Sequence, residues 1–346
     1  MRKRVWTWAL VGGMAAGVAG CEHRTPSPTS VQQGMEQVLA FAVEQQGAGN
    51  GSAIYAGGVG GVLRVSENPG CFSHAPAVSP DGRMVVYVSC SSPYGEDLYL
   101  GQPGLSGARL LTRTPDVESN PAWSPDGRWI AFDDDRGDVH GIVIIDSTGG
   151  HFRLIAQPLR SFRLGGWSFD AGSIVCSVEG ADASVSQIMI VYVPSLTMLE
   201  VTSGPGRKSH PVWSRDRTLA YVRDGALCLL HGTSDSLITT VPGAVTGHVT
   251  WSPDAQWLVF EGTDSAGRTD IYRVRRDGAD LVRLTAASFP GSTPVLSPDG
   301  TRIAYVARIG TTGKIYVMRA DGSAMFPVTS FATNESEPAW TTAQRQ

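Results

Sequence analysis

A tryptophan-containing motif recurs along this 346-residue chain at intervals of 38 to 46 residues. The copy from Pro121 to Gly127 reads PAWSPDG, and the last copy is cut short after Trp340. A period of roughly 40–45 residues with several short strands per unit is typical of a β-propeller. The residues at the tryptophan position of the seven copies are Val78, Trp123, Trp167, Trp213, Trp251, Leu296 and Trp340.

Each full copy is expected to supply four antiparallel strands. In the sixth copy these are 294–297, 302–307, 314–318 and 325–329, separated by turn residues such as Asp321-Gly322. Three further strands are expected before the first copy, and one around Trp340 at the end. The sequence therefore predicts an all-β, seven-bladed propeller of four-stranded blades, closed by pairing of the N-terminal strands with the C-terminal strand. The alternative is six blades with frayed extra strands.

The turn after each tryptophan position carries an aspartate in all six full copies. Aspartate stabilises turns by bonding nearby backbone groups, so we expect a structural role for the set and not a ring of functional carboxylates. Phe169 and Arg215 replace the turn proline in the third and fourth copies, which predicts distorted turns there. The six aspartates are Asp81, Asp126, Asp170, Asp216, Asp254 and Asp299.

The N-terminus has the features of an export signal. Residues 1–20 combine three basic residues with an apolar run, and Val18–Cys21 resembles a bacterial lipobox. That resemblance implies cleavage before Cys21 and lipidation of Cys21, followed by a flexible tether over 21–35 and the propeller over 36–346. Glu22 at the next position implies the periplasmic face of the outer membrane. The alternatives are an ordinary signal peptide with an incidental cysteine, and exposure at the cell surface or secretion.

Export to an oxidising compartment bears on the cysteines. Cys71 and Cys90 flank the first strand pair at the same end, so we predict a disulfide between them; two free thiols are the alternative. Cys176 and Cys228 occupy positions where other copies have Tyr or Phe, and we expect small core residues there. The formal net charge of −4, without a basic stripe, makes nucleic acid an unexpected partner.

A group of polar residues lies near one repeat station, three residues before the tryptophan position. The innermost strand of a propeller blade starts at the channel mouth, so we expect these side chains to form a polar binding site there. The histidines with Glu337 are also a candidate metal site, which is the alternative. The candidate residues are His74, one residue farther out, and Asn120, His210, His248, Thr293 and Glu337.

The same end should collect the longer connections between strands, where recognition usually occurs on a rigid scaffold. The sequence contains no Gly-x-Ser-x-Gly, His-Glu-x-x-His or Cys-x-x-Cys motif, so we expect no enzyme activity and no cofactor. The expected long polar connections are 44–51, 91–96, 179–186, 262–269 and 308–313.

The repeats resemble the TolB-type propeller repeat, a WD-like family of periplasmic proteins. The residues that carry the resemblance are the Trp123–Gly127 motif and its copies, together with Ile303–Tyr305, Ile315-Tyr316 and Asp321-Gly322. It implies a lipid-anchored envelope protein that binds a protein, peptide or glycan, without the N-terminal α/β domain of TolB. Oligogalacturonate lyase, a propeller enzyme, is similar in placing His ligands at such a mouth. That similarity implies the alternative, a metal-dependent polysaccharide lyase or hydrolase.

Overall fold

Every regular element among the described residues is a β-strand. The computed structural model describes residues 37–45, 51–58, 61–66, 70–92, 95–137, 139–155, 160–180, 182, 184–231, 234–286 and 289–341. They belong to one unit, 35–346. No part of the chain described here forms a helix that could cross a bilayer. The predicted signal peptide, Cys21 and the tether lie outside the described residues.

The strands pair antiparallel in groups of four. The N-terminal group contains a strand from the other end of the chain: β28 (Glu335–Trp340), β1 (Leu39–Gln45), β2 (Gly51–Gly58) and β3 (Gly61–Arg64). Two groups are joined into one sheet by a single parallel bridge between Glu96 and Val117. They are β4 (His74–Val78), β5 (Val85–Ser92), β6 (Gly95–Gly101) and β7 (Arg109–Leu110), and β8 (Val117–Trp123), β9 (Trp129–Arg136), β10 (Val139–Asp146) and β11 (Arg153–Ile155).

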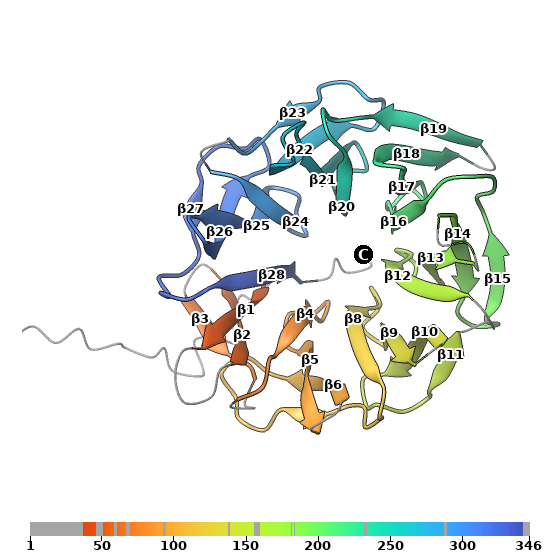
Figure 1. The fold of residues 1–346 in the computed structure, drawn as a ribbon. Helices are drawn as coiled ribbons and strands as arrows, with labels where there is room; N and C mark the ends of the chain where they lie inside the picture. Colours follow the sequence, from red (N-terminus) through yellow and green to blue (C-terminus); the bar gives the residue numbers. More distant parts are fainter. Residues whose placement is uncertain are drawn as a thin grey trace, which may run out of the picture. The chain divides into compact units, whose positions relative to one another are not determined.

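The remaining groups are separate four-stranded sheets. They are β12 (Ser161–Trp167), β13 (Ser173–Glu179), β14 (Ser186–Tyr192) and β15 (Thr197–Glu200); β16 (Lys208–Trp213), β17 (Leu219–Arg223), β18 (Ala226–His231) and β19 (Ser234–Thr239); β20 (Val245–Trp251), β21 (Trp257–Thr263), β22 (Thr269–Arg275) and β23 (Val282–Arg283); and β24 (Gly291–Leu296), β25 (Arg302–Ile309), β26 (Thr312–Arg319) and β27 (Phe326–Pro327). Within this unit, Figure 1 shows seven strands nearest the middle, and they are β4, β8, β12, β16, β20, β24 and β28.

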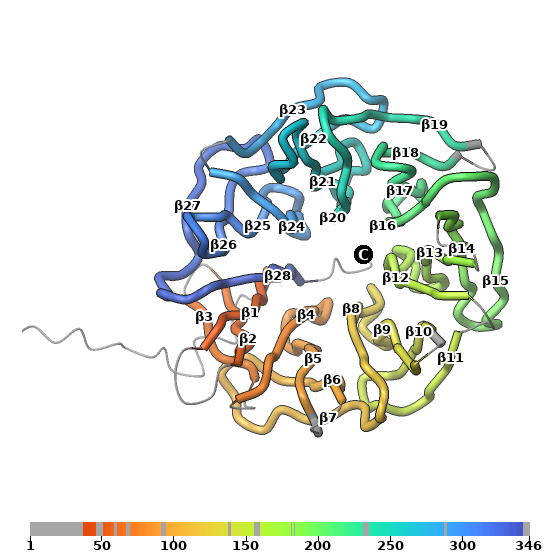
Figure 2. The backbone as a smooth tube through the Cα atoms, viewed as in Figure 1, coloured from red at the N-terminus to blue at the C-terminus, as the bar shows by residue number. Residues whose placement is uncertain are grey.

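The two ends of the described chain meet in one sheet. Leu39 in β1 lies opposite Trp340 in β28, and β1 pairs with β2 on its other side. Beyond β28, the Thr341 hydroxyl accepts a hydrogen bond from the Val38 amide at 2.6 Å, and the Thr341 amide donates to the Val38 carbonyl at 2.7 Å. Figure 2 shows the red N-terminal strands beside the blue C-terminal strand.

The core between the sheets is built from a repeated aromatic position in the second strand of each group. A buried Phe or Tyr side chain removes its apolar surface from water, which stabilises the fold by about 1.5–3 kcal/mol per residue. Cys176 fills the same position in β13 and is also buried, as the sequence predicts. Burial raises the pKa of this thiol to about 12, so it stays protonated. The aromatic residues are Phe41, Tyr87, Phe132, Tyr221, Phe260 and Tyr305.

The repeated turns share one hydrogen-bond network, which confirms the structural role predicted for the aspartates. In each full copy the serine hydroxyl donates to the aspartate at 2.5–2.7 Å and accepts a backbone N–H at the start of the next strand or from the residue before it, at 2.8–3.0 Å. The prediction that the turns at Phe169 and Arg215 are distorted is wrong. Those turns keep the network because Ala171 and Arg217 adopt the left-handed conformation that glycine takes in other copies.

Tryptophan side chains link neighbouring sheets. The indole N–H of three of them donates to a backbone carbonyl in the innermost strand of the preceding group, so each bond spans about one repeat. Such bonds satisfy a polar group that burial would otherwise leave without a partner. The donor–acceptor pairs are Trp123 with Ala77 at 3.2 Å, Trp167 with Ala122 at 3.0 Å, and Trp340 with Val295 at 3.2 Å.

Candidate functional site

The station singled out from the sequence has an unusual backbone. Asn120, His210, His248, Thr293 and Glu337 all adopt positive φ, between 46° and 55°. They lie within the innermost strands, at shifts of register, and not ahead of those strands as expected. The strands begin two to four residues earlier than the sequence pattern indicates, because pairing continues past the bulge. Residues other than glycine adopt this backbone conformation at a cost of about 1–3 kcal/mol, usually where a bulge changes the direction of a side chain.

His74 does not occupy this station. In the first copy the positive φ, 46°, belongs to Ala75. We call the six residues at this station, namely Ala75, Asn120, His210, His248, Thr293 and Glu337, the bulge residues. In the third copy the shift of register falls between Leu164 and Gly166, and Gly166 takes the positive φ, 149°.

His210 and His248 form a cluster with a residue that the sequence reasoning missed, Glu261 in β21. The Nδ1 atom of His248 lies 3.3 Å from a carboxylate oxygen of Glu261, and that oxygen also accepts the Thr293 amide at 2.8 Å. Burial raises the pKa of Glu261, but the bonds from His248 and the Thr293 amide outweigh it and leave the pKa lowered. Glu261 is therefore an anion held between β20 and β24.

His210 lies on the other side of this cluster, beside β20. Partial burial and the neighbouring His248 lower the pKa of its imidazole, while Glu261 opposes the shift. Its Nδ1 atom lies 3.0 Å from the Ser209 hydroxyl. Both histidine residues are exposed. His210 is thus more readily neutral than a free histidine, so it can donate and accept hydrogen bonds at neutral pH.

A second buried carboxylate, Asp133 in β9, connects β8 to β12. It accepts the Leu164 amide at 2.7 Å and lies 3.4 Å from the Asn120 side-chain nitrogen, which also donates to the Leu164 carbonyl at 3.0 Å. Burial raises the pKa of Asp133 to about 7, with the Leu164 amide and Arg163 acting in the opposite direction. Asn120 is therefore partly engaged in joining two sheets.

Glu337 in β28 makes the corresponding contact to β4, because its carboxylate accepts the Ala75 amide at 2.5 Å. Three carboxylates thus bind the backbone amide of the next innermost strand. Asp133 and Glu261 occupy the position after the buried aromatic residue of the second strand, where other copies have Val, Ala or Ser. This departure from the repeat is the sequence feature that could have identified Asp133 and Glu261 as site residues. The residues of the other copies are Ala42, Val88, Ser177, Val222 and Val306.

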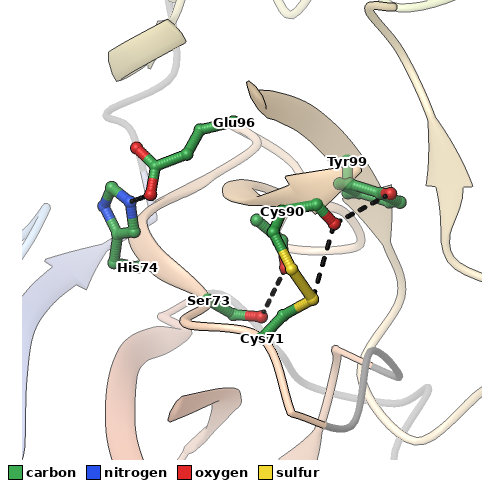
Figure 3. The surroundings of a disulfide bond; sticks show 7 residues. Cys71, Ser73, His74, Cys90, Glu96 and Tyr99 are labelled. Atoms are coloured by element: carbon green, nitrogen blue, oxygen red, sulfur yellow. Dashed lines mark hydrogen bonds and ion pairs between the residues drawn. A yellow bond between two sulfur atoms is a disulfide. The ribbon is translucent and has the colours of Figure 1, made fainter. Parts of the chain in front are cut away.

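His74 turns toward Glu96 in its own sheet, with 3.3 Å between Nε2 and the carboxylate (Figure 3). Cys71 and Cys90, beside it, form the disulfide expected from the sequence, with their Cα atoms 5.6 Å apart. The Ser73 and Ser89 hydroxyls bond at 3.0 Å between the same segments. His74 therefore lies in the part of the β4–β5–β6 sheet that the disulfide and the serine hydroxyl bond hold together, and it does not join the His210 cluster.

The candidate metal site does not assemble among the residues that the structure describes. No group of three or more His, Cys, Asp or Glu side chains in this part of the chain is arranged to hold a metal ion. The carboxylates of Glu337, Asp133 and Glu261 instead each bond a backbone amide. The arrangement provides imidazole, amide, hydroxyl and carboxylate groups for hydrogen bonding from several strands.

The expected long connections are only partly described, since 46–50, 93–94, 181 and 183 lie outside the described residues. The 308–313 connection is shorter than expected. Ile309 pairs with Thr312, so two residues form the turn and Gly310 takes a φ of 63°. Between β21 and β22, Asp264 accepts the amides of Ala266 and Arg268 at 2.8 and 3.0 Å, which gives an ordered loop beside the His248 cluster.

Comparisons with known proteins support the fold. No family model matches the chain. The chain is 27% identical to an uncharacterized peptidase, YuxL, of Bacillus subtilis over 57% of its own length, and it spans about a third of that relative's length (31%). It is 26% identical to the uncharacterized protein Atu1656 of Agrobacterium fabrum, with 70% of this chain and 68% of that protein aligned.

Solved structures with lower sequence identity to this chain also support the fold. TolB from Acinetobacter baumannii matches with a TM-score of 0.57 and 16% identity, covering 90% of this chain and 68% of that one. The β-propeller domain of the Trilobed protease from Pyrococcus furiosus matches with 0.58 and 14%, covering 75% and 86%. Oligogalacturonate lyase in complex with manganese matches with 0.63 and 15%, covering 84% of each chain. The chain has a TolB-like β-propeller fold, as the repeats predict.

Proposed function

We propose that the repeats close into a seven-bladed propeller in which β28 completes the blade begun by β1, β2 and β3. The support is the pairing of Leu39 with Trp340, together with the two hydrogen bonds that join Val38 and Thr341. The parallel bridge between Glu96 and Val117 is one residue pair long, so we interpret that eight-stranded sheet as two adjacent blades.

Thr341→Val tests this closure. The change removes the hydroxyl that accepts the Val38 amide at 2.6 Å, and Val38 is fully buried. An unpaired buried amide costs about 1–3 kcal/mol, so we expect the free energy of unfolding to fall by about 2 kcal/mol in urea titrations. Thr341→Ser keeps the hydroxyl and should retain most of the stability. Equal stability of the Val variant and the native protein would contradict a closure that depends on this contact.

We propose further that the protein is a non-enzymatic binding protein whose partner contacts the face bearing the bulge residues. The observation that carries this proposal is the repeated positive φ, which places exposed polar side chains from neighbouring innermost strands at one level. Asn120, His210, His248 and Glu337 offer donors and acceptors there, next to the Glu261 carboxylate. Such a surface suits a protein, peptide or glycan with many hydrogen-bonding groups.

For the location, we propose lipid anchoring through Cys21 at the periplasmic face of the outer membrane. The support is the lipobox-like Val18–Cys21 and the likeness of the propeller to that of TolB. The disulfide between Cys71 and Cys90 agrees with an oxidising compartment. Metabolic labelling with an alkyne-tagged fatty acid, followed by Cys21→Ala, tests the anchor: the label should disappear in the variant.

Site-directed photocrosslinking in the native cell envelope tests the binding proposal. A photoreactive residue at Thr246, which is exposed beside Glu261, should trap one partner. We expect His210→Ala with His248→Ala to lower the crosslinked yield about tenfold, because two interface truncations of about 1 kcal/mol each suffice for that loss. His151→Ala, an exposed histidine on another turn, is the matched control and should retain the yield. Undiminished crosslinking in the double variant, with unchanged thermal stability, would contradict this face.

A metal-dependent polysaccharide lyase or hydrolase is the second candidate, favoured by the similarity to oligogalacturonate lyase in complex with manganese. His210, His248 and Glu261 are the side chains that would have to rearrange into a ligand set. Elemental analysis of dialysed protein separates the candidates. A stoichiometric transition metal that is lost in the His210→Ala, His248→Ala variant would favour the enzyme.

A further inference from the structure

A cavity of about 390 Å³ opens at the other end of the innermost strands, where the tight turns gather. Its walls come from the ends of β12, β16, β20, β24 and β28 and from the turns that follow them. Five aromatic side chains contribute to these walls. The volume is within the range of small-molecule sites. The aromatic residues in the walls are Trp167, Phe169, Trp213, Trp251 and Trp340.

Two departures from the repeat meet in this wall. Phe169 and Arg215 stand where the other full copies have proline, and the Arg215 guanidinium carbon lies 4.7 Å from the centre of the Phe169 ring. The same pair also borders a neighbouring cavity of about 630 Å³. Because the turn network is intact in both copies, the turn does not require these replacements. They change the surface of the cavity and not the turn.

Two tryptophans in this wall lack the acceptor that the others have. The indole nitrogens of Trp213 and Trp251 are buried without a hydrogen-bond partner, whereas Trp167 and Trp340 donate to carbonyls of the preceding sheet. Trp251 is 8% exposed. A buried donor without an acceptor is costly, so a small rotation of either indole that brought its N–H to an acceptor on a bound molecule would be favourable.

The charge of the cavity indicates which kind of acceptor group a bound molecule would carry. Among the described residues that line it, Arg215 carries the only charge, and no carboxylate is present. An aromatic wall with a guanidinium and two unpaired N–H groups is complementary to an apolar body that bears an anionic oxygen. A cationic ligand would find no counter-charge among these residues.

We infer that this cavity binds an aromatic or apolar carboxylate, with Arg215 pairing the carboxylate and the tryptophans and Phe169 contacting the apolar body. None of the bulge residues lines this cavity, whose walls come from the tryptophan position, the residues beside it and the turns that follow, so the site is separate from the proposed binding face. The carboxylate has two possible sources, a small organic acid or the C-terminus of an apolar peptide, and they share this chemistry.

Titration calorimetry with matched probes tests the inference on the whole chain. The probes are 2-naphthoate against 2-naphthamide, and N-acetyl-Phe-Ala-Phe with a free C-terminal carboxylate against its C-terminal amide. We expect at least one acid to bind about tenfold more tightly than its amide, the effect of one charge-assisted hydrogen bond. Binding of naphthoate alone identifies a small organic acid, and binding of the tripeptide acid alone identifies a peptide C-terminus.

Two variants and one spectroscopic signature make the test specific. Arg215→Met should abolish the preference for acid over amide, while Arg128→Met, an exposed turn arginine of another copy, should keep it. In protein labelled with ¹⁵N-tryptophan, two indole N–H resonances should shift on binding of the acid. Equal affinity of acid and amide, no saturable binding of any probe up to about 1 mM, or loss of the preference in Arg128→Met would overturn the proposal.

Discussion

Replacing both Cys71 and Cys90 with serine is expected to lower the free energy of unfolding by about 3 kcal/mol. The two residues are 19 positions apart in sequence, so their bond closes a loop of intermediate length and restricts the unfolded chain. The native contacts add to this effect, because the disulfide joins the segment that enters β4 to the end of β5. The Ser73–Ser89 hydroxyl contact and the His74–Glu96 pair depend on the same alignment.

Thermal unfolding with and without a phosphine reductant provides the measurement. The oxidised native protein should unfold roughly 5–10 °C above the double serine variant, given the usual change of 2–4 °C per kcal/mol for domains of somewhat smaller size. Reductant should lower the native protein to the level of the variant and leave the variant unchanged. The buried thiols of Cys176 and Cys228 are present in both proteins and serve as the internal control. Coincident curves for oxidised protein and variant would refute a stabilising disulfide.

The fold could be predicted from the sequence because repetition makes local patterns unambiguous. One copy of the turn at Trp123 would be weak evidence for a propeller. Six copies of the Ser–Asp pair, each with the same hydrogen bonds, define where the second strand of each group begins. The same regularity made the aspartates recognisable as structural. Pairing of Phe41 and its neighbours with the last strand also follows from the repeat, since a propeller strand without a partner exposes its backbone groups.

The site could be predicted only in part, because its geometry depends on neighbouring sheets. The repeat station identified His210 and His248, but spacing alone does not report a positive φ. Glu261 was missed because it lies in a different strand and meets His248 only after the strands pair. His74 was grouped with this station although it lies one residue farther out, and the structure places it against Glu96 in its own sheet instead.

The cavity at the turn end illustrates a further limit. Phe169 and Arg215 were visible as departures from the repeat, but the sequence suggested a distorted turn there. Hydrogen bonds of the adjacent Ser and Asp hold each turn regardless of the residue between them, so the replaced side chain is free to serve the surface. In a repeat protein, a departure at a position that the turn does not need is better evidence for function than a residue common to all copies.

A buried acid group in β8 leads to the second large effect. Glu118 is 1% exposed, and one of its carboxylate oxygens accepts the Thr114 hydroxyl at 2.7 Å while the other has no partner. Burial raises the pKa of this carboxyl to about 8. The Thr114 bond lowers it, and the carboxylates of Asp97 and Asp134 raise it further. The folded protein therefore holds a proton on Glu118 that the unfolded chain releases near its ordinary pKa of 4.5.

The sign of the pH dependence follows from this difference. The Glu118 contribution favours the folded state fully below about pH 4.5 and is lost as the pH rises to about 8, because the unfolded chain then gains by ionising. Glu118→Gln keeps a neutral group that can still accept the Thr114 hydroxyl, and its amide N–H groups can donate to the neighbouring carboxylates. We expect the variant to match the native protein near pH 4.5 and to exceed it by about 3 kcal/mol at pH 8 and above.

Urea titrations at several pH values from 4.5 to 8.5 measure this difference. Comparing variant with native protein at each pH removes the contribution of other groups, including Asp133, whose raised pKa acts in the same direction. Glu200→Gln is the matched control, because that carboxylate is exposed and its contact with Arg160 at 3.0 Å lies at the surface, where an ion pair contributes little. A stability difference between Glu118→Gln and native protein that is constant with pH would show that Glu118 ionises equally in both states. Such a result would leave the unpaired oxygen without an energetic consequence, contrary to its position beside two other acids in a closed core.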